Sequence, residues 1–329
     1  MRRTGILDRV VGLLEGLNVT VYEDVEADPS VETVDEGVEL AGGCDTIVAL
    51  GGGSPLDAAK AISIVAGNGG HALDYVSGAK VKKPGPRIIA VPTTAGTGSE
   101  VTEVSVLTDL TRKAKKSFRS RYMYPALALD DPELTVTMPD EVTAHTGLDA
   151  LTHAIEAFTS KKSQPLTDPL CMEAAKLVLG NLETAYRKGS DIQARENMML
   201  GSLMAGYGIT HAGAGIVHGL SYALWKAVKT PHGLACGTVL PHAMRYNLGY
   251  EGGKYEALAR HCGIDGAEKL IARVEDVCAK VGAPTRLTGL GVSADQADSM
   301  LELGLSGSTA VNPRPTDAET LRTFINSMI

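Results

Sequence analysis

Strand-like and helix-like segments alternate along the first part of the chain, and the strand-like segments stop near residue 140. Runs rich in Val and Ile, bounded by Gly, Pro or Asp, are typical of buried strands. We predict strands over residues 18–22, 46–50, 87–91, 104–108 and 126–129. Apolar residues have helical spacing over 6–17, 30–41 and 56–66. This alternation predicts a parallel sheet with right-handed crossovers.

The second part of the chain is predicted to be entirely helical. Pro139 suits the start of a helix, and Asp140 and Glu141 favour the positive end of its dipole. Helical patterns follow over 141–159, 169–188, 192–206, 216–228, 233–246, 254–261, 267–281 and 317–328. A length of 329 residues suits two domains. We place an α/β domain at 1–139 and a helical domain at 140–329, with a cleft between them.

Composition excludes several classes of function. The chain has 31 Lys and Arg against 39 Asp and Glu, a net charge of −8, and no basic block. This argues against nucleic acid or an anionic membrane as a partner. No apolar run approaches the roughly 20 residues of a membrane span, and Asp8 interrupts any signal-like stretch. Five scattered cysteines without CxxC spacing favour a reducing, cytoplasmic location.

Two polar turns follow predicted strands in the α/β part. The first, GGGSP over 51–55, leads into a helix that begins LDAAK. Glycines allow backbone N–H groups to approach an anion closely, and the helix start adds free donors, so diphosphate is the natural guest. A tight turn without a ligand would have the same sequence. The second turn, PTTAGTGSE over 92–100, follows the next strand. Ligands in open α/β sheets bind where such turns meet.

Four side chains in the helical part have the chemistry of metal ligands. Asp149 and His153 are four residues apart in a helical pattern, so they lie on one face, one turn apart. His218 and His232 lie on or beside later helices. One carboxylate and three imidazoles could hold a divalent metal and leave room for a substrate oxygen. With eight histidines in the chain, any one of these residues taken alone is more often a core, capping or surface residue than a ligand.

The combination and order of five motifs resembles the iron-containing (group III) alcohol dehydrogenases. The motifs are GGGSPLDAAK over 51–60, PTTAGTGSEVT over 92–102, GLDALTHAIEAF over 147–158, VHG over 217–219 and PHG over 231–233. The NPRP of residues 312–315 also resembles that family, so the similarity covers nearly the whole chain. It implies a dehydroquinate synthase-like fold, with a Rossmann-like N-terminal domain, an all-α C-terminal domain and a homodimer or larger homo-oligomer.

The resemblance also implies roles for individual residues. Asp149, His153, His218 and His232 would be the metal ligands, with Fe(II) the metal that the family implies and Zn(II) the alternative. The residues implied to hold NAD or NADP are Gly52, Gly53, Ser54 and Asp57 at the diphosphate, Thr93, Thr94, Thr97 and Ser99 along the groove, and Lys115 or Lys116. The rest of the basic run over 112–116 is expected to be a solvated loop. The implied reaction is reversible hydride transfer between the nicotinamide and a small alcohol or aldehyde.

Several features depart from the family pattern. Tyr222 stands four residues after His218, where many relatives carry a second histidine; it could relay a proton or form an aromatic wall. His211 and Asp28 stand where relatives often have asparagine. Relatives usually also have a further N-terminal segment with a first strand and the residue that chooses between NAD and NADP. We therefore expect the sheet to be incomplete and the chain to be part of a longer protein.

Two other interpretations remain open at the level of sequence. One is a dehydroquinate synthase-like lyase, which joins a nucleotide-binding half to a metal-binding helical half without net NAD turnover. The other is a truncated, non-catalytic scaffold that binds metal but no dinucleotide. The order of the GLDALTH, VHG and PHG motifs favours the dehydrogenase.

Overall fold

The computed structural model describes residues 2–305 and 307–329 and divides the chain into two compact units. The first unit comprises Met1–Thr94 and Ser99–Thr137, and the second comprises Ala95–Gly98 and Met138–Ile329. Nothing in the sequence predicts that the short segment Ala95–Gly98 belongs to the second unit. The domain boundary that we place at residue 139 stays a prediction.

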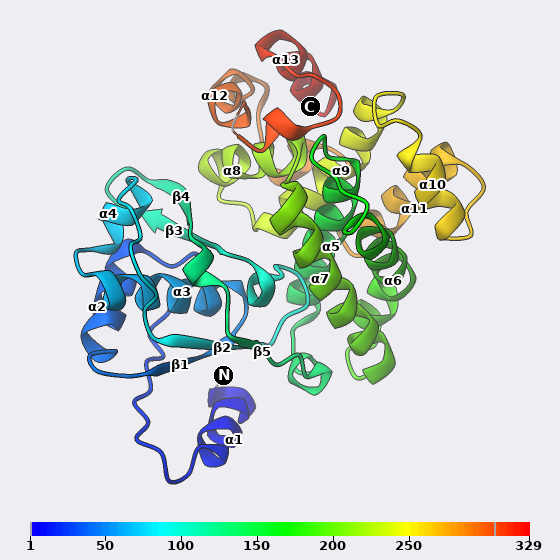
Figure 1. Ribbon diagram of the computed structural model, residues 1–329. Helices are drawn as coiled ribbons and strands as arrows, with labels where there is room; N and C mark the ends of the chain where they lie inside the picture. Colours follow the sequence, from blue (N-terminus) through cyan, green and yellow to red (C-terminus); the bar gives the residue numbers. More distant parts are fainter. Residues whose placement is uncertain (1, 306) are drawn as a thin grey trace. The chain divides into compact units, whose positions relative to one another are not determined.

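A parallel sheet forms the centre of the first unit (Figure 1). Its strands are β1 (Thr46–Gly51), β2 (Arg87–Pro92) and β5 (Leu127–Ala128), in the order β1-β2-β5. In the register of β1 and β2, Thr46 lies opposite Arg87 and Gly51 lies opposite Pro92. Both strands therefore end at the same edge of the sheet, and the two polar turns that follow them start side by side.

Among the described residues of this unit are four α-helices, and the longest of them follows the glycine turn. They are α1 (Ile6–Leu13), α2 (Val31–Leu40), α3 (Gly53–Asn68) and α4 (Ala72–Val76). The Leu56 and Ala59 side chains of α3 pack against Ile88 of β2 in one buried cluster. A second cluster joins Ile62 of α3 to Val34 of α2. This packing fixes the start of α3 at the carboxyl edge of the sheet.

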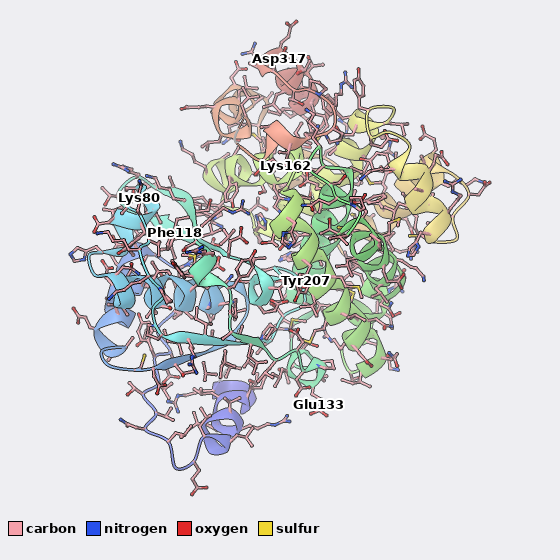
Figure 2. All side chains as sticks on the ribbon, viewed as in Figure 1. Lys80, Phe118, Glu133, Lys162, Tyr207 and Asp317 are labelled. Carbon is pink, nitrogen blue, oxygen red and sulfur yellow. The ribbon has the colours of Figure 1, made fainter. Side chains whose placement is uncertain are left out.

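The strand expected over 104–108 forms, but it belongs to a separate hairpin. β3 (Val104–Asp109) pairs antiparallel with β4 (Ala114–Arg119). The expectation of a solvated loop over 112–116 is therefore wrong from residue 114 onward, because these residues have a ladder partner in β3. Phe118 of β4 is buried, with its ring centroid 6.0 Å from that of Tyr75 (Figure 2). Lys80, also labelled there, is exposed.

The strand expected over 18–22 is wrong. These residues are all described and form no strand. Val19 and Val21 are each 39% exposed, so the alternation of apolar residues does not correspond to a buried face. Tyr22 instead packs on α2 and donates a hydrogen bond to the Thr33 carbonyl. Alternation favours a strand only where a neighbouring strand supplies backbone partners.

The second unit is helical, as the sequence predicts. Its helices are α5 (Asp140–Thr159), α6 (Asp168–Arg187), α7 (Ile192–Ala212), α8 (Ile216–Val228), α9 (His232–Asn247), α10 (Lys254–His261), α11 (Ala267–Lys280), α12 (Leu301–Gly304) and α13 (Ala318–Ser327). α5 is buried along most of its length and packs on α6, α7 and α9. Its residue Gly147 permits this, because a Cβ there would lie 2.3 Å from Leu182 of α6.

Helix α7 extends beyond its predicted end at residue 206. Gly206 and Gly208 predict a helix end in the sequence, but in the structure they are points of close packing. The Cα of Gly206 lies 2.5 Å from the position that a Cβ of Gly98 would occupy, and a Cβ on Gly208 would lie 2.4 Å from the Cys171 sulfur. The helix ends at Ala212, and Gly213 follows with a φ of 75°.

Candidate functional site

Four side chains from three helices of the second unit come together, with three imidazoles converging on one carboxylate oxygen. Asp149 and His153 come from α5, His218 from α8 and His232 from the start of α9. The Oδ1 of Asp149 lies 3.6 Å from the Nε2 of His153, 3.5 Å from that of His218 and 3.3 Å from that of His232. The structure thus brings together the four residues that the sequence marks as candidate metal ligands.

Hydrogen bonds behind two of the imidazoles orient their Nε2 atoms. His218 Nδ1 lies 2.6 Å from Glu156 Oε2, and His153 Nδ1 lies 3.2 Å from the Gly96 carbonyl. A Cβ on Gly96 would lie 2.5 Å from Thr146, so a glycine is needed for the backbone to approach α5. A carboxylate or carbonyl behind an imidazole fixes its tautomer and leaves the other nitrogen free to bind a metal.

The cluster contains buried polar atoms without hydrogen-bond partners. Asp149 is 4% exposed and His218 is 6% exposed. Among the described residues, Asp149 Oδ1 and His218 Nε2 have no hydrogen-bond partner. A buried polar atom without a partner costs stability, and a buried charge costs more. A divalent cation between these atoms would satisfy both, so the donor set fits a metal such as Fe(II) or Zn(II).

Electrostatic effects inside the cluster are strong and opposed. Burial alone would raise the pKa of Asp149, but His153 and His232 hold the pKa of that carboxyl well below its usual range. Burial lowers the pKa of His153 to about 4. Burial also works against charge on His218, yet Asp149 and Glu156 together raise its pKa to about 10. The pocket therefore favours positive charge between its two carboxylates.

Two residues of this cluster were missed by the sequence analysis. Glu156 lies seven residues after Asp149 on α5, and its Oε1 also accepts a hydrogen bond from the Val217 backbone N–H at 2.7 Å. Cys236 lies one turn after His232 on α9, with its Sγ 3.8 Å from His232 Nε2. Helical spacing from known candidates, at i+7 and i+4, is the signal that could have found both.

Tyr222 lies beside the cluster, one turn after His218 on α8. Its ring centroid is 6.2 Å from that of His232. His211, the other departure considered in the helical part, is exposed near the end of α7. Of these two residues, Tyr222 has a ring contact with a candidate ligand, and none is observed for His211 among the described residues.

In the first unit, the two polar turns approach each other closely. The backbone N–H of Thr93 donates to the carbonyl of Gly51 at 2.9 Å. A Cβ on Gly52 would lie 3.1 Å from the Cγ2 of Thr94, so glycine permits this approach. Gly53 and Ser54 then form the first turn of α3. The arrangement places free helix N–H groups beside threonine hydroxyls, a combination suited to phosphate oxygens.

Asp57 and Ser99 form a buried polar network with Lys60. Ser99 Oγ donates to Asp57 Oδ1 at 2.6 Å, and the Val106 backbone N–H donates to Asp57 Oδ2 at 2.9 Å. Lys60 Nζ donates to Ser99 Oγ at 2.7 Å. Burial raises the pKa of Asp57 and lowers that of Lys60. Both carboxylate oxygens of Asp57 are engaged within the unit, which ties α3 to the segment that carries Ser99.

Lys115 forms an ion pair beside the glycine turn. Its Nζ lies 2.6 Å from Asp28 Oδ1, and its side chain is only 7% exposed. The backbone N–H of Asp28 donates to Ser54 Oγ at 3.1 Å. Asp28 has a φ of 58°, a left-handed conformation that aspartate tolerates. Asp28 therefore links Lys115 to the start of α3. Thr97, the remaining candidate, lies in the segment of the second unit.

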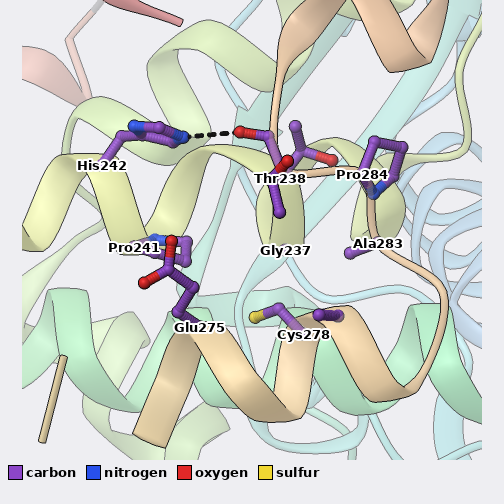
Figure 3. Close-up of a pocket in the computed structure, with 10 residues that line it drawn as sticks. Gly237, Thr238, Pro241, His242, Glu275, Cys278, Ala283 and Pro284 are labelled. Carbon is purple, nitrogen blue, oxygen red and sulfur yellow. Dashed lines mark hydrogen bonds between the residues drawn. The ribbon is translucent and has the colours of Figure 1, made fainter. Parts of the chain in front are cut away.

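Two hollows in the structure lie away from these residues. A cavity of about 10 Å³ in the helical unit is lined by residues of α9 and α11, and His242 Nε2 lies 2.8 Å from the Thr285 carbonyl at its rim (Figure 3). It could hold about one water molecule. An open hollow of about 600 Å³ in the first unit is lined by residues that precede β1 and β2. It lies at the opposite ends of these strands from the glycine turn, so neither hollow defines the candidate site.

Within the part of the chain that the structure describes, none of the helices combines the length and the apolar character that a membrane span requires.

Two family models match the chain. The model of iron-containing alcohol dehydrogenases matches residues 1–132, and the model of the C-terminal part of the Fe-containing alcohol dehydrogenase family matches residues 143–329. Among curated proteins, a 1,3-propanediol dehydrogenase from Klebsiella pneumoniae is 38% identical over 325 residues, which cover 95% of this chain and 84% of the relative.

Solved structures resemble the chain over its whole length. A 1,3-propanediol oxidoreductase superposes with a TM-score of 0.96 at 36% identity, covering 100% of this chain and 90% of the other. A sulfoacetaldehyde reductase from Bifidobacterium kashiwanohense, solved in complex with NAD+, has a TM-score of 0.95 at 33% identity, with coverages of 99% and 88%.

Proposed function

The chain belongs to the iron-containing alcohol dehydrogenase family, and from that premise we propose how its residues carry out the reaction. It is an NAD(P)-dependent alcohol dehydrogenase, and its reaction is hydride transfer between a nicotinamide and the oxygen-bearing carbon of a small alcohol or aldehyde. The matching proteins are dehydrogenases and reductases, which favours this function over the lyase and over the non-catalytic scaffold.

The metal ligands in this proposal are Asp149, His153, His218 and His232. The observation that carries it is the convergence of three Nε2 atoms to within 3.6 Å of Asp149 Oδ1. Asp149 Oδ1 and His218 Nε2 are buried without hydrogen-bond partners, which supports a cation between them. When bound, Fe(II), or Zn(II) as the alternative, supplies Lewis-acid polarisation of the substrate oxygen.

Two groups position the ligands without touching the substrate. Glu156 accepts from His218, and the Gly96 carbonyl accepts from His153, so both imidazoles present Nε2 toward Asp149. Such partners raise the basicity of a ligand and hold its ring orientation. The ligands then need little reorganisation when a metal binds.

Tyr222 is the side chain that we assign to proton transfer at the substrate hydroxyl. A phenol can both donate and accept a hydrogen bond, as a proton relay requires. Its position one turn after His218, beside the His232 ring, supports the assignment. An aromatic wall for the substrate is the alternative role.

In this proposal the nucleotide is bound by the residues that the family resemblance implies, most of which belong to the first unit. Backbone groups of Gly52 and Gly53, with Ser54, hold the diphosphate through the start of α3. The residues that line the remaining cofactor groove are Thr93, Thr94, Thr97 and Ser99, with Lys115 as the cation. Asp57 acts by holding Ser99 in place. The cofactor is NAD or NADP.

The proposal also covers the substrate class, the cellular location and the oligomeric state of the protein. The names of the similar proteins point to small alcohols and aldehydes, such as a propanediol or a substituted acetaldehyde. None of the five cysteines, all of which lie among the described residues, forms a disulfide, which supports a reducing cytoplasm. We expect a homodimer or larger homo-oligomer, which light scattering coupled to gel filtration would measure.

The experiment that tests this function combines metal analysis with turnover. Apo protein is loaded anaerobically with Fe(II), its metal content is measured, and NADH or NADPH consumption is followed with propanal. The proposal expects one metal per chain and turnover that depends on it. Protein that binds metal and dinucleotide but oxidises no nicotinamide with any small aldehyde would contradict it. The same protein before loading is the matched control.

A further inference from the structure

A sulfur atom lies at the edge of the proposed metal centre. Cys236 is fully buried, and its Sγ is 3.8 Å from His232 Nε2. The candidate ligand atoms of Asp149, His218, His232 and Cys236 all lie within 4.8 Å of one another. From this arrangement, which rests on the proposed metal site, we propose that Cys236 is an additional ligand that coordinates thiophilic divalent metals such as Zn(II) and Co(II).

The spacing of the donor atoms suits a shared divalent ion. Zn–N and Zn–O bonds of about 2.0–2.1 Å and Zn–S bonds of about 2.3 Å place neighbouring donors roughly 3.3–3.5 Å apart. Asp149 Oδ1 lies 3.3 Å from His232 Nε2 and 3.5 Å from His218 Nε2. The distance of 3.8 Å from His232 Nε2 to the sulfur exceeds this range by a few tenths of an ångström.

A second observation shows that the group as a whole faces a ligand. Asp149 Oδ1 and His218 Nε2 have no hydrogen-bond partner among the described residues, and both side chains are more than nine-tenths buried. These two atoms belong to the same set of four as the sulfur. Cys236 is therefore more than a lone buried thiol, because its neighbours already have unmet bonding capacity.

The chemistry of the donors separates two modes of binding. Imidazole and carboxylate suit Fe(II), Zn(II) and Co(II), whereas a thiolate selects for softer ions. With Fe(II), Asp149 and the three histidines suffice, and the thiol stays protonated. With Zn(II) or Co(II), the sulfur joins and its proton passes to solvent, so two anionic ligands balance the divalent charge. The sulfur would then occupy coordination space that the substrate oxygen needs.

This inference identifies Cys236 as a residue that sets metal selectivity. The chain would bind Zn(II) more tightly than Fe(II). The Zn(II)-loaded enzyme would turn over its substrate more slowly than the Fe(II)-loaded enzyme. Replacing the sulfur with an oxygen should reduce this difference, because a serine hydroxyl is a poor ligand for a soft ion.

The test uses Co(II) as a spectroscopic probe of the apo protein. A thiolate bound to Co(II) gives a charge-transfer absorption in the near ultraviolet, in addition to the visible bands of the ion. We expect wild type to develop the near-ultraviolet band up to one equivalent of Co(II). Cys236→Ser should keep the visible bands and lose the near-ultraviolet band. Cys262→Ser, at a partly exposed cysteine outside this set, is the matched control and should behave as wild type.

The outcomes separate this inference from the proposed function. Stoichiometric Co(II) binding to wild type without a near-ultraviolet band would overturn the role of Cys236 and leave the Asp149 and histidine site intact. An undiminished band in Cys236→Ser would overturn it as well. Failure of wild type to bind Co(II) would overturn both. A competition between Zn(II) and Fe(II) gives an independent readout: Cys236→Ser should lose affinity for Zn(II) more than for Fe(II).

Discussion

His218 Nδ1 lies 2.6 Å from Glu156 Oε2, and this contact directs the opposite nitrogen of the ring toward Asp149. Glu156 also accepts from the Val217 backbone N–H through its other oxygen. One carboxylate on α5 therefore fixes both the side chain and the backbone at the start of α8. The proposed metal site therefore depends on this contact as well as on the proposed ligands.

Glu156→Gln should weaken metal binding while the four ligands stay in place. A glutamine has one acceptor oxygen, so it cannot accept from both His218 and Val217. We expect the affinity for the metal to fall about 10–100-fold, as is usual for the partners of ligating histidines. Competition with a chelator measures this. Glu141→Gln, at an exposed position of the same helix, is the control, and equal affinities for the two variants would contradict the role.

Asp28→Asn should tighten the binding of the dinucleotide. The Asp28 carboxylate lies 2.6 Å from the Lys115 ammonium and offsets its charge, so neutralising Asp28 leaves more positive charge to attract the anionic cofactor. Asp28 is 43% exposed, so solvent screens the effect, and we expect a two- to five-fold lower Kd. Fluorescence titration with NADH and NADPH measures it. Asp24→Asn carries the same charge change at an exposed site, and weaker binding by Asp28→Asn would sink the assignment of Lys115.

Glu100 should make the stability of the protein depend on pH. Burial, aided by Asp130, raises the pKa of Glu100 from 4.5 to about 7. The pKa of Glu100 is higher in the folded state than in the unfolded state. The contribution of Glu100 to the free energy of unfolding is therefore fully present below pH 4.5 and is lost as the pH rises through 7. Glu100→Gln should therefore stabilise the protein at pH 8 by up to about 3 kcal/mol and much less at pH 5.

Urea unfolding at the two pH values checks this prediction. Glu39→Gln, which removes an exposed carboxylate, is the control and should show little dependence on pH. A Glu100→Gln variant that gains the same stability at both values would show that the Glu100 carboxyl does not titrate in this range.

Tyr222→Phe should slow the reaction without removing the metal. Loss of a positioned proton donor or acceptor typically costs about 10²–10⁴-fold in rate. We expect kcat to fall by at least about 100-fold, with unchanged metal content. Tyr207→Phe, at an exposed tyrosine of α7 (Figure 2), is the control. A kcat equal to that of wild type would assign Tyr222 to an aromatic wall.

Most helix boundaries in the second unit could be predicted from the sequence because each helix carries its own pattern, although α7 extends beyond its predicted end. The predicted and observed bounds of the helix over 216–228 are identical. The strand over 18–22 could not be excluded in the same way, since whether Val19 and Val21 pair depends on a neighbouring strand that no local pattern reveals. The hairpin of β3 and β4 could not be predicted for the same reason. Its strands pair across a basic run that resembles a loop.

In the candidate site too, local spacing could be predicted from the sequence, whereas contacts that depend on tertiary packing could not. Spacing puts Asp149 and His153 on one helical face, but only the packing of α5, α8 and α9 brings His218 and His232 to the same oxygen. Glu156 escaped notice because a carboxylate on a helix is ordinarily a surface residue. The pairing of Lys115 with Asp28 depends on the register of a hairpin that the sequence analysis did not predict.

We propose that the metal ligands share Asp149 Oδ1 as their common point, and the Asp149→Asn variant tests this proposal. The substitution keeps the shape of the side chain and removes its charge. Metal content after anaerobic loading with Fe(II) is the measurement, with Asp140→Asn at the exposed start of the same helix as control. We expect Asp140→Asn to retain one metal per chain and Asp149→Asn to retain almost none. Full metal content in Asp149→Asn would contradict this proposal.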